Sequence, residues 1–146
     1  MGDFLGCGTR EECRDSSERF NRMEADLHNL WASLDYVNRH RSNYEFRLID
    51  GEGHSLEGCD IERIRIDGEY VIEPRQIARG NVARSIFYMH SEYGLPIPDG
   101  MRDVLLEWNK NDPPSCHEMR RNNTIERLQG TRNRYIDHPS TAETSQ

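Results

Sequence analysis

The clearest pattern of hydrophobic and polar positions lies in the middle of the chain, over residues 61–72. Ile64 and Ile66 alternate with arginines, Asp67-Gly68 follows as a two-residue turn, and an apolar segment then returns. Alternation of this kind predicts strands, and an Asp-Gly pair between two such runs is typical of a β-hairpin. Glu73-Pro74 is expected to end the second strand. The sequence therefore predicts an antiparallel hairpin.

Apolar residues at helical spacing predict two helices in the second half of the chain, and the Asp112-Pro113-Pro114-Ser115 turn with its cap precedes a third. The first is expected to end at Gly94, the second to begin after Asp99 as its cap, and the third to run from about Cys116 to Leu128. The apolar stripes are Val82, Ile86, Met89 and Tyr93 in the first helix, and Met101, Val104, Leu105 and Trp108 in the second.

Patterns in the first third of the chain and at its end are weaker. Residues 1–15 read as a loop, and a short helix is expected to open near Ser16, with Phe20, Met23 and Leu27 on one face. Residues 27–30 fit a short strand or a turn, a second helix is expected over about residues 33–41, and residues 140–146 form a polar tail with no reason to be ordered. The fold class we predict is α+β: a mixed, helix-rich single domain with a small antiparallel element.

Length and charge limit the classes of function. With 146 residues the chain fits one domain, and no apolar run approaches the roughly 18 residues of a membrane span, so we expect no membrane association. A formal net charge of −7 argues against a protein that binds nucleic acid with its whole surface. A local basic segment nevertheless contains five arginines against one acid: Arg120, Arg121, Arg127, Arg132 and Arg134, with Glu126. It could contact phosphate or pair with the acidic remainder, and the sequence leaves both open.

Four cysteines leave the redox state unresolved at this stage. Cys7 and Cys13 bound a loop short enough for a disulfide to close, but four cysteines allow three complete pairings. No Cys-x-x-Cys pair occurs, so zinc is disfavoured. The first residues show no secretory leader, which predicts a cytoplasmic protein with reduced thiols if the sequence is complete, whereas a Cys7/Cys13 loop fits an oxidising compartment.

Asn38 and Arg41 stand about one turn apart on a predicted helix. An amide oxygen is a suitable ligand for a hard cation, and an arginine can neutralise a phosphate, so the pair fits a metal-assisted phosphodiester site. Solvated helix residues have the same spacing, and spacing alone favours that second reading.

Seven groups of residues in chain order are similar to the motifs of the bacterial endonuclease I family. The resemblance extends over about residues 4–139. The groups are Met23 to Leu30 with Val37-Asn38 and Arg41 to Tyr44; Arg79 to Arg84 with Phe87-Tyr88-Met89; Tyr93-Gly94-Leu95; Trp108-Asn109-Lys110 with Asp112-Pro113-Pro114; Arg121-Asn122-Asn123; Ile125 with Gln129-Gly130 and Asn133; and Ile136 to Pro139.

The resemblance implies a secreted or periplasmic nonspecific nuclease built on a ββα-metal (His-Me) finger. It implies Mg²⁺ or a similar cation, DNA or RNA as substrate, a monomeric enzyme, and an endonuclease I-like domain over residues 1–139. The residues that match the family's functional positions are Asn38 for the metal; Arg10 and Glu24 near the scissile phosphate; Arg41, Asn43, Arg121, Arg132 and Asn133 for nucleic acid; and Cys7 with Cys13 for a disulfide. His28 matches a shared structural position of the family and is the third catalytic candidate.

One departure from the family pattern affects the chemistry. The family's general-base histidine belongs to a Glu-His-x-x-Pro motif upstream of the Cys7/Cys13 loop, and this sequence does not contain it, so we expect the first finger strand to be missing. His28 and, less directly, His40 are candidate substitutes, although a structural hydrogen-bonding role fits His28 better. Two hypotheses follow: a nuclease whose finger is completed by an upstream segment or a protein partner, and a catalytically inactive homologue that acts as a binding or structural component.

Overall fold

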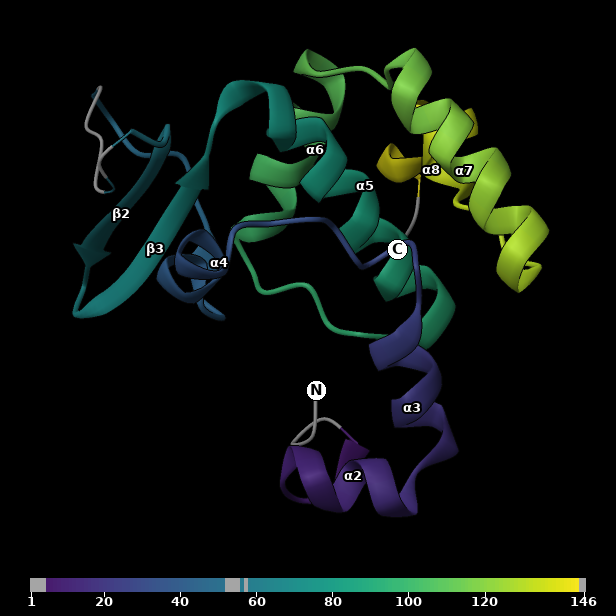
Figure 1. Cartoon of the computed structure of the whole chain (residues 1–146). Helices are drawn as coiled ribbons and strands as arrows, with labels where there is room; N and C mark the ends of the chain where they lie inside the picture. The colour runs from purple at the N-terminus through teal and green to yellow at the C-terminus, as the bar shows by residue number, and fades with distance from the viewer. Residues whose placement is uncertain (1–4, 52–55, 57, 145–146) are drawn as a thin grey trace.

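The structure, a computed structural model, describes residues 5–51, 56 and 58–144 (Figure 1). It is a mixed α+β domain, as predicted, in which helices surround one side of a small sheet. The helices are α2 (Arg10–Ser16), α3 (Glu18–Ala25), α4 (Asp35–Arg41), α5 (Gln76–Tyr93), α6 (Met101–Asn111), α7 (Cys116–Gln129), α8 (Arg134–Asp137) and the 3₁₀ helix η1 (Pro139–Glu143). The strands are β1 (Glu45–Phe46), β2 (Ile61–Ile66) and β3 (Glu69–Pro74).

The predicted hairpin is confirmed as β2 and β3, which pair antiparallel from Ile61 opposite Pro74 to Ile66 opposite Glu69. Asp67 and Gly68 both have positive φ, 52° and 88°, as a two-residue hairpin turn requires. The sequence did not reveal β1, which adds to β3 in parallel and gives the sheet order β1-β3-β2. Two residues are too few to show an alternating pattern.

The predicted helices of the second half are confirmed, with changes at their ends. α5 ends at Gly94, which adopts the left-handed conformation, but it begins at Gln76, before the apolar stripe starts. The Ser115 hydroxyl caps α7 by accepting from the Glu118 backbone N–H. Asp99 does not cap α6: the cap position is Gly100, with φ 79° and no side-chain hydrogen bond.

Two segments predicted to be irregular are helical. Residues 1–15 were expected to form a loop, but Arg10–Ser16 is helical because Thr9 and Glu12 form a reciprocal capping box. The tail was expected to lack order, but residues 139–143 form η1, with Ala142 fully buried. The Asn109 side chain donates to the Pro139 carbonyl at 2.9 Å and holds this end against α6.

The shorter segments predicted between residues 16 and 54 agree with the structure in part. The helix expected near Ser16 is α3, capped by the Ser17 hydroxyl, and residues 27–29 form a turn rather than a strand. The helix expected over about residues 33–41 is α4, which begins at Asp35. The Gly51-Glu52-Gly53-His54 sequence also predicts a loop, of which all but Gly51 lies outside the described residues.

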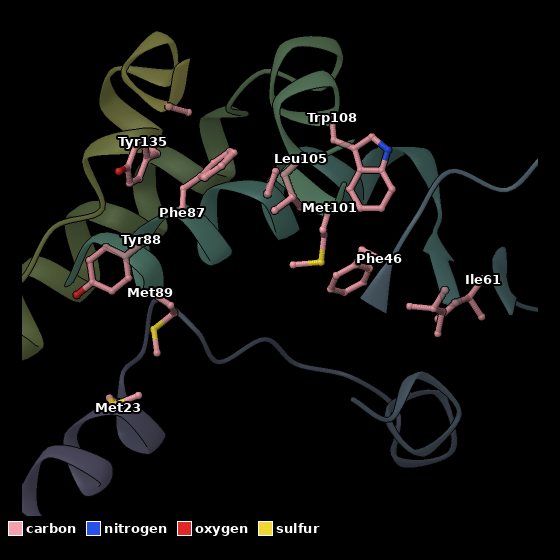
Figure 2. Close-up of a cluster of buried hydrophobic side chains, with 13 residues drawn as sticks. Met23, Phe46, Ile61, Phe87, Tyr88, Met89, Met101, Leu105, Trp108 and Tyr135 are labelled. Atoms are coloured by element: carbon pink, nitrogen blue, oxygen red, sulfur yellow. The ribbon is translucent and has the colours of Figure 1, made fainter. Parts of the chain in front are cut away.

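The core joins the sheet to the helices in one continuous cluster (Figure 2). The Phe46 ring meets Trp108 edge to face, with centroids 5.9 Å apart, and Phe87 lies 5.7 Å from Tyr135. Met23 of α3 approaches Met89 of α5 and fixes the N-terminal helices to the domain (Figure 2). The fully or nearly buried aromatic and aliphatic members are Met23, Phe46, Ile61, Ile72, Phe87, Tyr88, Met89, Met101, Leu105, Trp108 and Tyr135.

The Arg79–Arg84 motif has a structural explanation. Gly80 packs so tightly on the loop after α6 that a Cβ there would lie 2.0 Å from the Asp112 carbonyl oxygen. Arg84 is fully buried and forms a two-point ion pair with the buried Glu118, both N–O distances being 2.7 Å. These contacts join α5, α6 and α7, so this family motif builds the fold rather than contacting a ligand.

Candidate functional site

Glu24 joins the two N-terminal helices through a small ion-pair cluster. Its carboxylate accepts hydrogen bonds from Arg14 at 2.7 and 3.0 Å, and from the Arg10 Nε. The bond from Arg14, and then that from Arg10, lowers the pKa of Glu24 despite partial desolvation. The Arg10 side chain remains 68% exposed. Glu24 therefore orients an arginine that is open to an incoming phosphate.

The Cys7–Cys13 disulfide lies at the start of the same unit. The structure contains this bond, across a separation of six residues, and leaves Cys59 and Cys116 free. Cys13 is buried, and the Thr9–Glu12 capping box lies within the closed loop. Loop and cap together fix the first turn of α2, where Arg10 stands.

Asn38 lies on α4, in a separate part of the molecule. Its side chain is exposed and makes no hydrogen bond within the described part of the chain, so its amide oxygen is free to bind a cation. Figure 1 shows α4 beside the sheet and apart from α2 and α3. The structure therefore brings Arg10 and Glu24 together but does not bring Asn38 to them.

Arg41 and Asn43 flank the turn that follows α4. The Arg41 guanidinium lies 4.8 Å from the centre of the Phe46 ring and donates to the Ser42 carbonyl at 2.6 Å, and burial lowers the pKa of Arg41. Asn43 is exposed and accepts from the Ser42 hydroxyl at 3.3 Å. Ser42 has φ 51°, a conformation that costs energy in a non-glycine residue and recurs at functional sites.

His28 is buried in a polar network, with 1% of its surface exposed. Its ring lies 4.5 Å from that of Tyr88, and its Nε2 lies 3.1 Å from the Thr131 carbonyl oxygen. Burial lowers the pKa of His28, which favours the neutral ring. The remaining ring nitrogen, Nδ1, is buried without a partner. A general base must reach its proton directly or through one water, and this placement offers His28 no such access.

Asp26 is the centre of that network. Tyr88 and Tyr93 donate to one carboxylate oxygen at 3.0 and 2.7 Å, and the His28 backbone and Gln129 donate to the other at 2.8 and 2.9 Å. Desolvation raises the pKa of Asp26, but the four hydrogen bonds outweigh it and the pKa ends below its usual value. This carboxylate is a structural anchor between α3 and α5.

The C-terminal candidates mostly make contacts within the fold. Arg121 donates to the Leu27 carbonyl and, at 2.6 Å, to the Leu30 carbonyl, and it lies 4.1 Å from the centre of the Trp31 ring. Asn133 is 1% exposed; its amide donates to the Arg84 carbonyl and its oxygen caps α8. In this structure Asn133 has no surface on which to contact nucleic acid.

Arg132 is saturated by acidic partners. It pairs with both oxygens of Asp137 at 2.6 and 2.8 Å, with Glu126 at 2.8 Å, and donates to Asn123 at 2.8 Å. The hydrogen bonds that Arg132 donates to Asp137 raise the pKa of Arg132. The predicted basic segment is thus neutralised around Arg132 by its own carboxylates.

The role of Arg14 could be seen only in the structure. Arg14, the second partner of Glu24, follows Arg10 by four residues, a helical spacing hidden by the loop prediction. Among the described residues no group of three His, Cys, Asp or Glu is placed to hold a metal ion. No helix among them is long and apolar enough to cross a membrane.

Comparison with known proteins gives a consistent family. A family model described as Endonuclease I matches residues 9–140. A periplasmic deoxyribonuclease of Aeromonas hydrophila is 34% identical over 140 residues, which cover 94% of this chain and 58% of the relative. An extracellular ribonuclease of Bacillus subtilis (strain 168) is 35% identical over 136 residues, covering 81% of this chain and 45% of the relative. The chain thus spans about half to six-tenths of the length of these relatives.

Proposed function

Because the chain belongs to the endonuclease I family, we propose that it acts on nucleic acid as a metal-dependent nuclease that hydrolyses phosphodiester bonds. The observation that supports this best is the family match over residues 9–140, nearly the whole chain. Relatives named as deoxyribonuclease and as ribonuclease both align here, so DNA and RNA are both candidate substrates. The endonuclease I-like unit would comprise residues 1–139, with residues 140–144 packed against it.

Four residues have a chemistry that fits this activity. The exposed Asn38 amide would supply an oxygen ligand to Mg²⁺ or a similar cation, which keeps several water and phosphate ligands of its own. Arg10, oriented by Glu24, lies apart from Asn38 in this structure and would contact another phosphate of the same nucleic acid. Arg41, at the end of the helix that contains Asn38, and Asn43, two residues farther along, would contact the strand near the cation.

The fit to a metal is partial. Asn38 offers one neutral ligand, and the described residues provide no cluster of carboxylates or imidazoles around it. A bound cation would polarise the phosphate and lower the pKa of water. No base is assigned within the described residues, because the sequence lacks Glu-His-x-x-Pro and His28 is buried. The alternative is that these 146 residues bind nucleic acid without cleaving it, as a binding or structural component.

The Cys7–Cys13 disulfide bears on the compartment. Structural disulfides persist mainly in oxidising environments, and relatives of this chain are named periplasmic or extracellular. We therefore place the proposed activity outside the reducing cytoplasm.

A plasmid-nicking assay tests the proposal. A metal-dependent nuclease should nick the plasmid in Mg²⁺, and EDTA should abolish this cleavage. The cleavage should be lost in Asn38→Ala and kept in Asn111→Ala. Asn111 is a matched control, because it is also an exposed helical asparagine but lies at the end of α6. Absence of cleavage by a folded chain that still binds plasmid would refute hydrolysis and favour the binding alternative.

A further inference from the structure

Two tyrosines and two arginines form a cluster on one face of the sheet: Tyr44, Arg63, Arg65 and Tyr70. The rings of Tyr44 and Tyr70 lie 5.2 Å apart. The Arg63 guanidinium lies 5.9 Å from the centre of the Tyr44 ring and 5.0 Å from that of Tyr70, and Arg65 lies 5.0 Å from Tyr70. We refer to these four residues as the hairpin cluster.

The strand register builds this cluster. Arg65 lies directly opposite Tyr70 in the β2–β3 hairpin, so their side chains share a face. Glu45 is opposite Val71 across the parallel pair, which brings Tyr44, one residue earlier, beside Tyr70. Tyr44, Tyr70 and Arg65 thus lie side by side in a row across the sheet.

The arginines of the cluster keep their charge available. Neither Arg63 nor Arg65 forms an ion pair with a described residue, and Arg63 donates only a 3.4 Å hydrogen bond to the His40 carbonyl. Arg132, in contrast, has three of its N–H donors on carboxylates. Tyr70 is 38% exposed and Arg65 is exposed, so a ligand can reach both.

An exposed ring, Tyr70, beside a half-buried ring, Tyr44, and two arginines without ion pairs to described residues match the chemistry of single-stranded nucleic acid. Unpaired bases stack on aromatic faces, and guanidinium groups bind the phosphates between them, whereas the bases of a duplex are already stacked on one another. The cluster also adjoins the helix that contains the candidate metal residue Asn38, because Arg63 donates to the His40 carbonyl in the last turn of α4.

We propose that the hairpin cluster is a binding platform for the unpaired nucleotides of a single strand, with bases stacked on Tyr70 and Tyr44 and phosphates held by Arg63 and Arg65. The proposal rests on the proposed action on nucleic acid and extends it. It gives the protein a preference for single-stranded over duplex substrate through residues that contact no metal.

Binding of a labelled oligothymidylate, measured by fluorescence anisotropy in EDTA, tests the platform without cleavage. Tyr70→Ala is expected to weaken binding about tenfold, the loss of one stacked base, while Tyr70→Phe keeps the ring and the affinity. Arg65→Ala is expected to weaken binding and reduce the salt dependence by nearly one counterion. Arg120→Ala removes the same charge from α7, far from the hairpin in Figure 1, and is expected to change affinity less than twofold.

Three results would overturn the platform: no binding of the oligothymidylate by the intact chain, equal effects of Tyr70→Ala and Arg120→Ala, or equal weakening of single-strand and duplex binding by Tyr70→Ala. Circular dichroism on each variant checks that it is folded, and the Phe and Arg65 variants keep the test decisive if Tyr70→Ala unfolds. If the protein cleaves plasmid but Tyr70→Ala binds the oligothymidylate as tightly as the parent, only the platform is refuted. Binding through the cluster without plasmid cleavage would refute only the nuclease activity.

Discussion

The buried ion pair between Arg84 and Glu118 gives the sharpest test of the fold. The two side chains are 0% and 2% exposed, and they link α5 to α7 across the core. All five N–H donors of the guanidinium have acceptors, the remaining ones being Asn81, Asn109 and the Asp112 carbonyl. Glu118→Gln would leave the shape of this site almost unchanged but remove the negative charge and point an amide N–H₂ toward the guanidinium.

We expect a large loss of stability, because the charge of Arg84 stays buried without its partner. Breaking one partner of a buried pair costs about 3–5 kcal/mol, a substantial part of the roughly 5–15 kcal/mol that stabilises a typical domain. For a chain of this length, that corresponds to a fall in Tm of roughly 10 °C or more. Urea unfolding followed by tryptophan fluorescence measures it, because Trp108 lies in the core and Trp31 against Arg121.

Asp35→Asn provides a matched control. It removes the same charge from the Asp35–Arg39 pair on α4, whose side chains are 75% and 70% exposed, and should cost less than about 1 kcal/mol. Replacing both buried partners, Arg84→Met with Glu118→Leu, should cost less than the sum of the two single changes, because no charge is left unpaired. If Glu118→Gln lowers the free energy of unfolding no more than Asp35→Asn does, the buried pair does not stabilise the fold.

Three further outcomes are expected. Gly80→Ala should destabilise the fold by more than 1 kcal/mol in urea unfolding, because the added Cβ would lie 2.0 Å from the Asp112 carbonyl oxygen; an unchanged midpoint would contradict this packing. Burial lowers the pKa of His28, so its contribution to the free energy of unfolding is present above the unfolded pKa near 6.5 and is lost as pH falls. Between pH 7.5 and 5, the free energy of unfolding should therefore depend less on pH in His28→Gln than in the parent, and an equal dependence would contradict this. Reduction of Cys7–Cys13, which closes a loop of separation six, should cost about 2 kcal/mol by the chain-entropy estimate, and a melting curve unaffected by reductant would refute it.

Periodicity predicted the larger elements because their patterns repeat over several turns or residue pairs. The hairpin, α5 and α6 were found in this way, whereas α7 was expected after the Asp112–Ser115 turn and its cap. Short elements escaped, since β1 has two residues and α8 has four. α2 escaped for another reason: it has one buried residue, Cys13, and its start is set by a capping box rather than an apolar stripe.

The candidate site was harder to predict because its residues owe their roles to partners far along the chain. Arg121 holds carbonyls more than ninety positions earlier, and Asn133 contacts the Arg84 carbonyl across 49 positions. Nothing in the local sequence separates such structural polar residues from ligand-binding ones. The hydrogen bonds, which the sequence does not show, give Arg121 and Asn133 their structural roles.

Counting charges within each arginine cluster indicates which surfaces can meet a phosphate. Around Glu24, two arginines face one carboxylate, a local charge of +1. Around Arg132, one arginine faces two carboxylates, a local charge of −1. The hairpin cluster has two arginines and no ion pair with a described residue, a local charge of +2. In a chain of net charge −7, attraction of a polyanion depends on such local excesses. Arg132 is therefore a weaker candidate for contact with a phosphate, and the hairpin cluster and the start of α2 are stronger ones.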